Sequence, residues 1–287
     1  MQFEKELGFR PLLTGPSYDE IIAQDLQNGK ALVAKYTFPG PDPSVKHEEH
    51  ITETGVRLKS YTPPNFKPGQ PIVLYIHGGG FAIGSVDLDD RFCNVQSKDT
   101  GCMFVSVEYR LAPQHKYPAA LSDCVEGAGW CIDNAESLNC LKGRIVIMGK
   151  SAGGSLALGA ALKLIDGGRG ANVVGVVAGQ PCTVHPNNLP PGMSEAYKSY
   201  DENATNTVNT KQGMLAFYGM STVDILKPLK TSLTTEEMYG APENDPFTYP
   251  LLHPMLGFIP KVYLNACGAD TLRDDARLLK AVLDENE

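Results

Sequence analysis

The chain has 287 residues, of which 42% are hydrophobic and 20% are charged. A chain of this length and composition can bury a large core within one α/β domain. Its formal net charge is -8, and it has no block of Lys and Arg residues. These features argue against a surface for nucleic acid or for an anionic membrane, because both require clustered positive charge. They favour a neutral small molecule as the partner.

The N-terminus and the cysteines predict a cytoplasmic protein. The opening residues, MQFEKELGFR, are charged and lack the apolar core of a signal peptide. No stretch approaches the roughly 20 apolar residues that span a bilayer. The seven cysteines stand singly, without a Cys-x-x-Cys pair, which is typical of buried free thiols in a reducing compartment. No His, Cys or carboxylate cluster has the spacing of metal ligands, so we expect no metal and no organic cofactor.

Taken in chain order, the elements alternate between strand and helix after an N-terminal segment. Residues 1–45 include a helix-like run, SYDEIIAQDLQNGKALVAKY. Short apolar runs rich in β-branched residues then predict buried parallel strands. These runs are Ile72–Ile76, Phe104–Val107, Ile145–Met148, Val173–Val177 and Val262–Leu264. Helical patterns cover Pro118–Ala135 and Ser155–Ile165. The alternation predicts an α/β fold with a mostly parallel sheet and helices on both faces.

A second segment that breaks the alternation covers residues 183–245. It is rich in Pro, Asn and Thr, with a helical piece around Gln212–Tyr218. Long excursions of this kind are typical of lids or caps. We therefore divide the chain into an N-terminal cap segment (1–45), a core (46–182 and 246–287) and a cap insertion (183–245).

Ser151 is the candidate nucleophile. It lies in Gly149-Lys150-Ser151-Ala152-Gly153, which follows a predicted strand and opens a predicted helix, the context of a nucleophile elbow. The two glycines let strand and helix approach closely around a tight turn, so that the serine is strained and its hydroxyl exposed. The helix adds a positive dipole at its N-terminus. An ordinary glycine-rich turn is the alternative interpretation.

The run His77-Gly78-Gly79-Gly80-Phe81 closes the first apolar strand. Successive residues without Cβ can turn their N–H groups toward one point, as an oxyanion hole requires. A phosphate-binding loop and a plain turn are the alternatives. We expect His77 to brace this loop by hydrogen bonding rather than to act as a base.

Four motifs, HGGGF, VEYRLAPQHKYPAAL, GKSAGG and GADTLRDDA, occur in this order. In sequence and spacing they resemble the hormone-sensitive-lipase-like branch of the α/β-hydrolase fold, from about residue 70 onward. The resemblance implies a carboxylesterase that cleaves small esters of short or medium acyl chain through an acyl-enzyme on Ser151. It implies an oxyanion hole from the N–H groups of Gly79, Gly80 and Ala152, and Asp270 as the catalytic acid.

The position of Asp270 also makes it the candidate acid, because it comes after a predicted strand, at the strand end where α/β sheets gather their sites. We expect its neighbours Asp274 and Asp275 to be charges at a helix N-terminus. The element from Tyr109 to Pro113 reads as a strand end held by a buried Arg110.

The sequence departs from the resemblance at the histidine. The chain order Ser, Asp, His places that residue after Asp270, but all six histidines precede it, at positions 47, 50, 77, 115, 185 and 253. We expect His185 and His253 to be surface residues. We interpret the order as a fold that lacks its C-terminal strand and histidine loop within these 287 residues. The alternatives are a hydrolase-fold protein that binds ligands without turnover, or a lactonase, deacetylase or lyase acting on a complex metabolite.

Lys150 is the second departure, because relatives most often carry an acidic residue before the serine. We favour a solvated Lys150 over one that pairs with a substrate carboxylate. The sequence leaves open the physiological substrate and the oligomeric state, a homodimer included.

Overall fold

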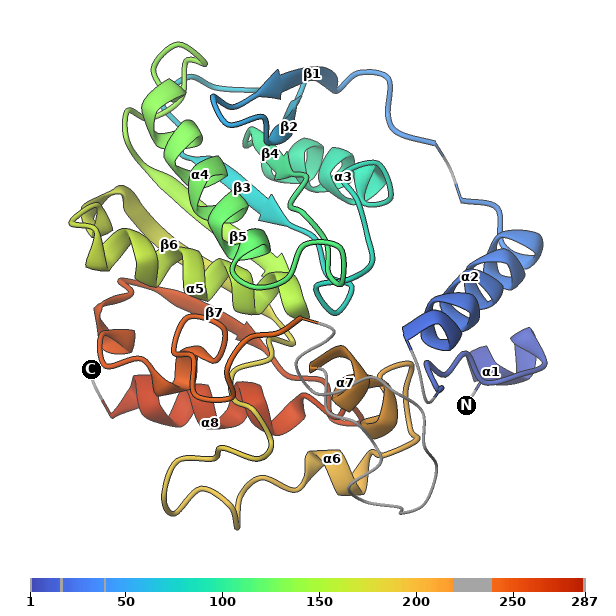
Figure 1. Cartoon of the computed structure of the whole chain (residues 1–287). Helices are drawn as coiled ribbons and strands as arrows, with labels where there is room; N and C mark the ends of the chain where they lie inside the picture. The colour runs from blue at the N-terminus through green and yellow to red at the C-terminus, as the bar shows by residue number, and fades with distance from the viewer. Residues whose placement is uncertain (1, 16–17, 39, 219–238, 286–287) are drawn as a thin grey trace.

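The computed structural model describes residues 2–15, 18–38, 40–218 and 239–285 (Figure 1). The helices are α1 (Gln2–Leu7), α2 (Tyr18–Lys35), α3 (Asp90–Thr100), α4 (Ala119–Asn134), α5 (Ala152–Asp166), α6 (Ser199–Glu202), α7 (Lys211–Tyr218) and α8 (Arg273–Asp284). The strands are β1 (Lys46–Ile51), β2 (Arg57–Thr62), β3 (Ile72–Ile76), β4 (Phe104–Val107), β5 (Ile145–Lys150), β6 (Val173–Gly179) and β7 (Val262–Asn265). No helix in these ranges is long and apolar enough to cross a bilayer.

The described strands form one sheet of seven strands, in the order β1-β2-β4-β3-β5-β6-β7. The strands from β4 through β3, β5 and β6 to β7 are parallel, whereas β1, β2 and β4 pair in antiparallel fashion. Every predicted strand is confirmed. The hairpin of β1 and β2 was not predicted, because β1 (KHEEHI) is polar and mostly exposed. Such a strand lies at a sheet edge and carries no apolar run.

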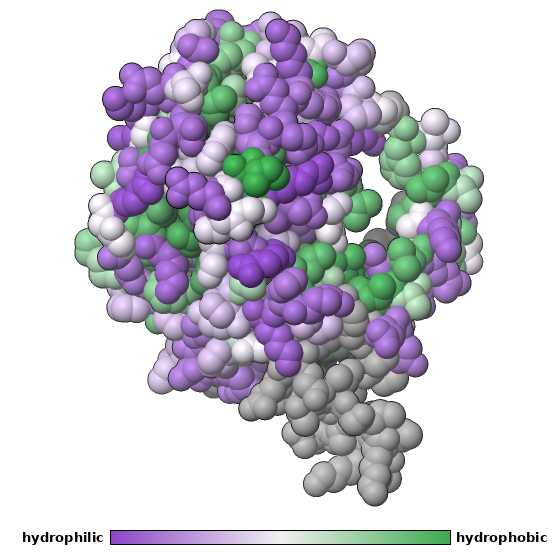
Figure 2. All heavy atoms as spheres, turned by 45° about the horizontal axis from the view of Figure 1, so that its top comes forward, coloured by the Kyte–Doolittle hydropathy of each residue, from purple (hydrophilic) through white to green (hydrophobic). Residues whose placement is uncertain are grey.

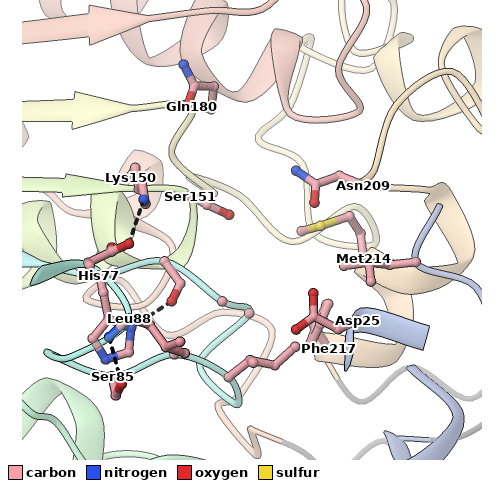
Figure 3. A pocket seen from close by; sticks show the side chains of 17 residues that line it. Asp25, His77, Ser85, Leu88, Lys150, Ser151, Gln180, Asn209, Met214 and Phe217 are labelled. Atoms are coloured by element: carbon pink, nitrogen blue, oxygen red, sulfur yellow. Dashed lines mark hydrogen bonds and ion pairs between the residues drawn. The ribbon is translucent and has the colours of Figure 1, made fainter. Parts of the chain in front are cut away.

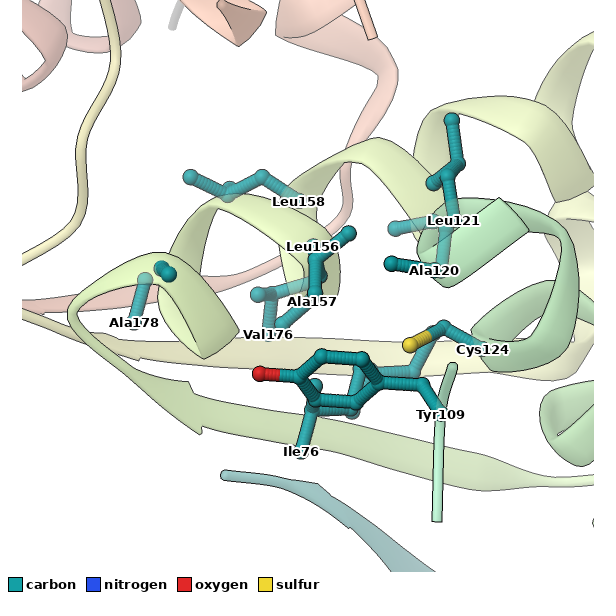
Figure 4. Close-up of a cluster of buried hydrophobic side chains, with 14 of the residues drawn as sticks. Ile76, Tyr109, Ala120, Leu121, Cys124, Leu156, Ala157, Leu158, Val176 and Ala178 are labelled. Atoms are coloured by element: carbon teal, nitrogen blue, oxygen red, sulfur yellow. The ribbon is translucent and has the colours of Figure 1, made fainter. Parts of the chain in front are cut away.

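Helices cover both faces of the sheet, as predicted. On one face Val73 and Tyr75 of β3 pack in a cluster with Cys93 of α3. On the other face Ile76 of β3 joins the main core beneath α4 and α5 (Figure 4). Because successive strand residues point to opposite faces, a strand covered on both sides is apolar throughout. All of β3 is accordingly buried.

The N-terminal segment is joined to the segment around residue 209. Leu13 forms a parallel bridge with Asn209, and its N–H donates to the carbonyl of Val208 at 2.9 Å. The Thr210 hydroxyl donates to the Leu13 carbonyl at 2.5 Å. Buried Asn28 of α2 donates to the carbonyl of Leu12 at 3.3 Å. These bonds place α2 beside α7, at the end of the molecule shown at the lower right of Figure 1.

Figure 2 shows one face of the molecule. This face is mostly hydrophilic and is hollowed between the body and the N-terminal segment.

All seven cysteines are free thiols, as expected. Five of them are buried, but Cys102 is half-buried and Cys267 is exposed. The division into core and cap segments stays a prediction, and residues 219–238 of the predicted insertion lie outside the described residues.

One expectation about a charged residue was wrong. Arg110 is not buried, because half of its side chain is exposed, and the buried partner is Asp123. The Asp123 carboxylate accepts the backbone N–H of Arg110 at 2.8 Å and its guanidinium at 2.7 Å. Asp274 and Asp275 lie in the first turn of α8, as predicted, and both are buried. Each carboxylate accepts backbone N–H groups of the segment that crosses over α8.

Asp275 holds the segment that crosses over α8 to this helix by hydrogen bonds. One carboxylate oxygen accepts the N–H groups of Thr183 at 2.8 Å and Val184 at 3.3 Å, and the other accepts the Tyr197 hydroxyl at 2.9 Å. Burial, together with the nearby charge of Asp270, raises the pKa of the Asp275 carboxyl from 3.8 to about 7 and outweighs these hydrogen bonds.

This pKa predicts that stability falls with rising pH. The folded protein favours the protonated carboxyl, so its contribution is complete below about pH 4 and is lost as the pH rises through about 7. In Asp275→Asn the side chain keeps similar hydrogen-bonding capacity but does not titrate. Urea unfolding between pH 5 and 8 is expected to show a steeper decline in the free energy of unfolding for the wild type than for this variant. Equal slopes would contradict the prediction.

Candidate active site

Ser151 occupies the sharp turn between β5 and α5. Its backbone has φ 54° and ψ -128°, a conformation that is costly for a residue with a side chain. Its N–H donates to the carbonyl of Gly179 at 2.7 Å, which fixes the turn to β6. A Cβ on Gly153 would overlap the carbonyls of Ile76 and His77. Glycine at this position therefore allows α5 to pack directly on the end of β3.

The glycine loop lies against this turn. Gly79 has φ 116°, and its carbonyl accepts the N–H of Ile83 at 2.8 Å, which closes the loop. A Cβ built on Gly78 would stand 3.4 Å from the Cβ of Ser151, so the loop runs beside this residue. Within the described residues, the N–H groups of Gly79, Gly80 and Ala152 donate to no acceptor. These three N–H groups are therefore unpaired within the part of the chain that the structure describes.

His77 braces the loop, as predicted. Its Nδ1 lies 2.7 Å from the carbonyl of Gly78. Because a carbonyl can only accept, Nδ1 carries the proton. The ring stacks on Tyr109 with centroids 4.1 Å apart, and the Tyr109 hydroxyl donates to the His77 carbonyl at 3.1 Å. Burial lowers the pKa of His77 and favours the neutral ring.

Ser151 and the loop form one side of a cavity of about 330 Å³ (Figure 3). Apolar contributions come from Leu13, Ile83, Leu88, Met214 and Phe217, and polar ones from Asp25, Asp89, Lys150, Gln180 and Asn209. The volume and the mixed wall are typical of a small-molecule site. Neither α2 nor α7 carries a catalytic motif, so the residues that they place in this wall could not be identified from the sequence.

Lys150 has a partner that neither earlier interpretation included. Its Nζ lies 3.1 Å from the Asp89 carboxylate, whose second oxygen accepts the Tyr75 hydroxyl at 2.7 Å. The ammonium also lies 5.1 Å from the centre of the Phe92 ring. Lys150 is therefore neither merely solvated nor free for a substrate carboxylate.

Asp270 lies after β7 and is buried. One carboxylate oxygen accepts the N–H of Leu272 at 3.0 Å and lies 3.3 Å from the hydroxyl oxygen of Thr271. The other oxygen has no donor among the described residues. Asp270 does not line the cavity beside Ser151.

No described histidine hydrogen-bonds to the Ser151 hydroxyl, and His77 is the histidine that lines the cavity. The expectation that His185 and His253 lie at the surface was wrong, since both are buried. His185 accepts the N–H of Asn187 and packs on Tyr218 and Tyr249. His253 lies 3.4 Å from Asp166, and its Nδ1 accepts the N–H of Met255. Both rings are held within their own local structure.

Comparison with known proteins agrees with this geometry. Residues 73–287 match the alpha/beta hydrolase fold family. A versiconal hemiacetal acetate esterase of Aspergillus parasiticus is 43% identical over 283 residues, which cover 99% of this chain and 82% of the relative. A second versiconal hemiacetal acetate esterase, from Emericella nidulans, is 39% identical over 254 residues, covering 88% of this chain and 80% of the relative. A hyperthermophilic esterase from the archaeon Pyrobaculum calidifontis has a similar structure, with a TM-score of 0.73 and 27% identity over 99% of this chain and 82% of that chain.

The matched family region includes the glycine loop, the Ser151 turn and Asp270, and relatives named as esterases align over nearly the whole chain. The chain therefore belongs to the alpha/beta hydrolase fold family, in its hormone-sensitive-lipase-like branch, and is a carboxylic ester hydrolase.

Proposed function

We propose that Ser151 is the nucleophile of this hydrolase and that it forms an acyl-enzyme with a small ester. The supporting observation is the backbone of Ser151, which is held at positive φ on the turn between β5 and α5 and lines the cavity. Strain of this kind persists where the surrounding structure enforces it, and it is concentrated at functional sites. The names of the relatives favour a short acyl group such as acetate.

The negative charge of the tetrahedral intermediate would fall on the former carbonyl oxygen of the ester. We propose that the N–H groups of Gly79, Gly80 and Ala152 stabilise it, since none of them is used by another described residue. Each well-placed donor of this kind contributes on the order of 10²- to 10³-fold in rate. The N-terminal dipole of α5 adds to this effect.

Asp270 is proposed to orient the histidine that takes the proton from Ser151. Its free carboxylate oxygen, on a buried side chain whose other oxygen is fixed by Leu272, suits an acceptor for an imidazole N–H. Chain order places that histidine after Asp270. We propose further that residues 1–45 and 183–245 are cap segments that shape the pocket, since α2 and α7 line it.

A binding protein without turnover is the second candidate, but the names of the relatives do not favour it. A lactonase, a deacetylase or a lyase would use the same residues, but the names of the relatives favour ester cleavage.

The proposal predicts that Ser151→Ala abolishes hydrolysis of p-nitrophenyl acetate, butyrate and octanoate. Loss of one essential member of such a triad costs on the order of 10⁶-fold in kcat. Release of p-nitrophenol is to be measured for the 287-residue chain and for a version continued with whatever its gene encodes after Glu287. Ser122→Ala, on the exposed face of α4, is the matched control.

If either wild-type chain is active and Ser151→Ala is inert, the proposal holds. Equal turnover by wild type and Ser151→Ala would remove Ser151 from the chemistry. Ligand binding by both chains without any turnover would support the second candidate.

The pair of Lys150 and Asp89 predicts that Lys150 does not select carboxylate-bearing esters. We expect 4-carboxyphenyl acetate to have a lower kcat/KM than phenyl acetate, because Asp25 adds a negative charge to a cavity in which Lys150 is already neutralised. Asp89→Asn frees the Lys150 ammonium. It should raise the ratio of kcat/KM for 4-carboxyphenyl acetate to kcat/KM for phenyl acetate by about fivefold, which corresponds to the upper range of energies for a partly exposed ion pair. Asp87→Asn removes an exposed charge nearby and serves as the control. An unchanged ratio in Asp89→Asn would contradict the prediction.

A further inference from the structure

Asp25 interrupts the buried face of α2. Ile21 is fully buried four positions before it, and Asn28 is 5% exposed three positions after it. Residues spaced by three and four lie on one face of a helix, so Asp25 occupies the side of α2 that packs inward. An apolar residue is expected there, because an unpaired charge is unfavourable away from water.

The Asp25 carboxylate lines the cavity, and Figure 3 shows it on the side opposite Ser151. No cation or hydrogen-bond donor contacts it among the described residues. Lys150, the lysine in the same wall, already pairs with Asp89. Partial burial raises the pKa of Asp25.

Asn209 adds a second polar group without a partner. Its backbone is fixed, because it bridges Leu13 and its carbonyl accepts the hydroxyl of Thr271 at 3.1 Å. Its side-chain amide lines the same cavity and has no hydrogen bond within the described residues. Figure 3 shows this amide on the Asp25 side of the cavity. A carboxylate accepts hydrogen bonds and an amide can donate them, so the two side chains offer both functions to one ligand.

We propose that Asp25 and Asn209 recognise a hydroxyl group on the part of the ester that lies farthest from Ser151. A hydroxyl donates to a carboxylate and accepts from an amide, whereas an ammonium group only donates. The surrounding Leu13, Met214 and Phe217 fit an apolar body that carries this hydroxyl. Asp25 is thus a specificity-determining residue, and this role rests on the proposed function of Ser151.

The test compares three phenyl acetates of similar size that carry hydroxymethyl, ethyl or aminomethyl at the ring position opposite the ester. Dissociation constants are measured by calorimetry on Ser151→Ala protein, so that binding is read without turnover. We expect the hydroxymethyl ester to bind about tenfold more tightly than the ethyl ester, as a hydrogen bond to a charged group allows. When Asp25→Asn is added to the Ser151→Ala protein, the ratio of the two dissociation constants, ethyl ester to hydroxymethyl ester, should fall close to one. Asp19→Asn, an exposed position on α2, is the matched control and should leave the ratio unchanged.

Three results overturn the inference. The first is equal binding of the hydroxymethyl and ethyl esters, and the second is a ratio that survives Asp25→Asn. The third is tightest binding by the aminomethyl ester, which would identify Asp25 as a site for a cation. The ratio of kcat/KM values, measured in whichever chain is active, should follow the binding ratio.

Failure of the proposed function has a different signature. If wild type and Ser151→Ala hydrolyse the esters equally, the nucleophile is wrong and the inference falls with it. If Ser151→Ala is inert but Asp25→Asn leaves both ratios unchanged, only the role of Asp25 is overturned.

Discussion

The site depends on the close packing of α5 against the end of β3, which Gly153 permits. With any side chain at this position, the start of α5 would collide with the carbonyls of Ile76 and His77. The same approach forces Ser151 into positive φ and brings the glycine loop beside it. The positions of Ser151, of the Ala152 N–H and of the glycine loop therefore share one steric cause. Moving the helix outward would separate all of them together.

Electrostatics in the cavity follow from which charges are already paired. Asp89 accepts hydrogen bonds from both Tyr75 and Lys150, so the lysine beside Ser151 is held by the protein. Asp25 lacks such a partner among the described residues. The cavity therefore differs along its length, with an engaged ion pair near Ser151 and an unpaired carboxylate on the α2 side. A ligand that carries a donor can satisfy that carboxylate, whereas one that carries an anion is repelled.

The sequence was informative where local chemistry and fold coincide. The Ser151 turn and the glycine loop could be predicted because their glycines meet steric demands that are written within a few residues. The parallel strands were predicted because burial on both faces leaves a continuous apolar run. The edge strand β1 has no such run, and its pairing with β2 is visible only in three dimensions.

Long-range contacts explain what the sequence did not reveal. Asp274 and Asp275 lie at a helix start, as predicted, but their bonds to backbone N–H groups more than 70 residues away could not be read from the sequence. Arg110 is half exposed and its partner Asp123 is buried, because burial is decided by the packing of α4 and not by the strand end. Asp25 lies on the same helix face as Ile21 and Asn28, which are buried in the structure. Only the three-dimensional structure shows that its carboxylate lines the cavity.

The bridge between Leu13 and the segment of Asn209 also bears on the order in which the protein assembles. Leu13 and Thr210 are 197 positions apart, so a ribosome makes the first partner long before the second. The sheet, the Ser151 turn and the glycine loop use contacts of shorter separation, which close at lower entropic cost. During synthesis Ser151 can therefore take its strained backbone conformation before the N-terminal segment contacts Asn209 and Thr210. The part of the cavity wall that Leu13 and Asn209 supply would then form after the Ser151 turn, when the chain returns to its own beginning.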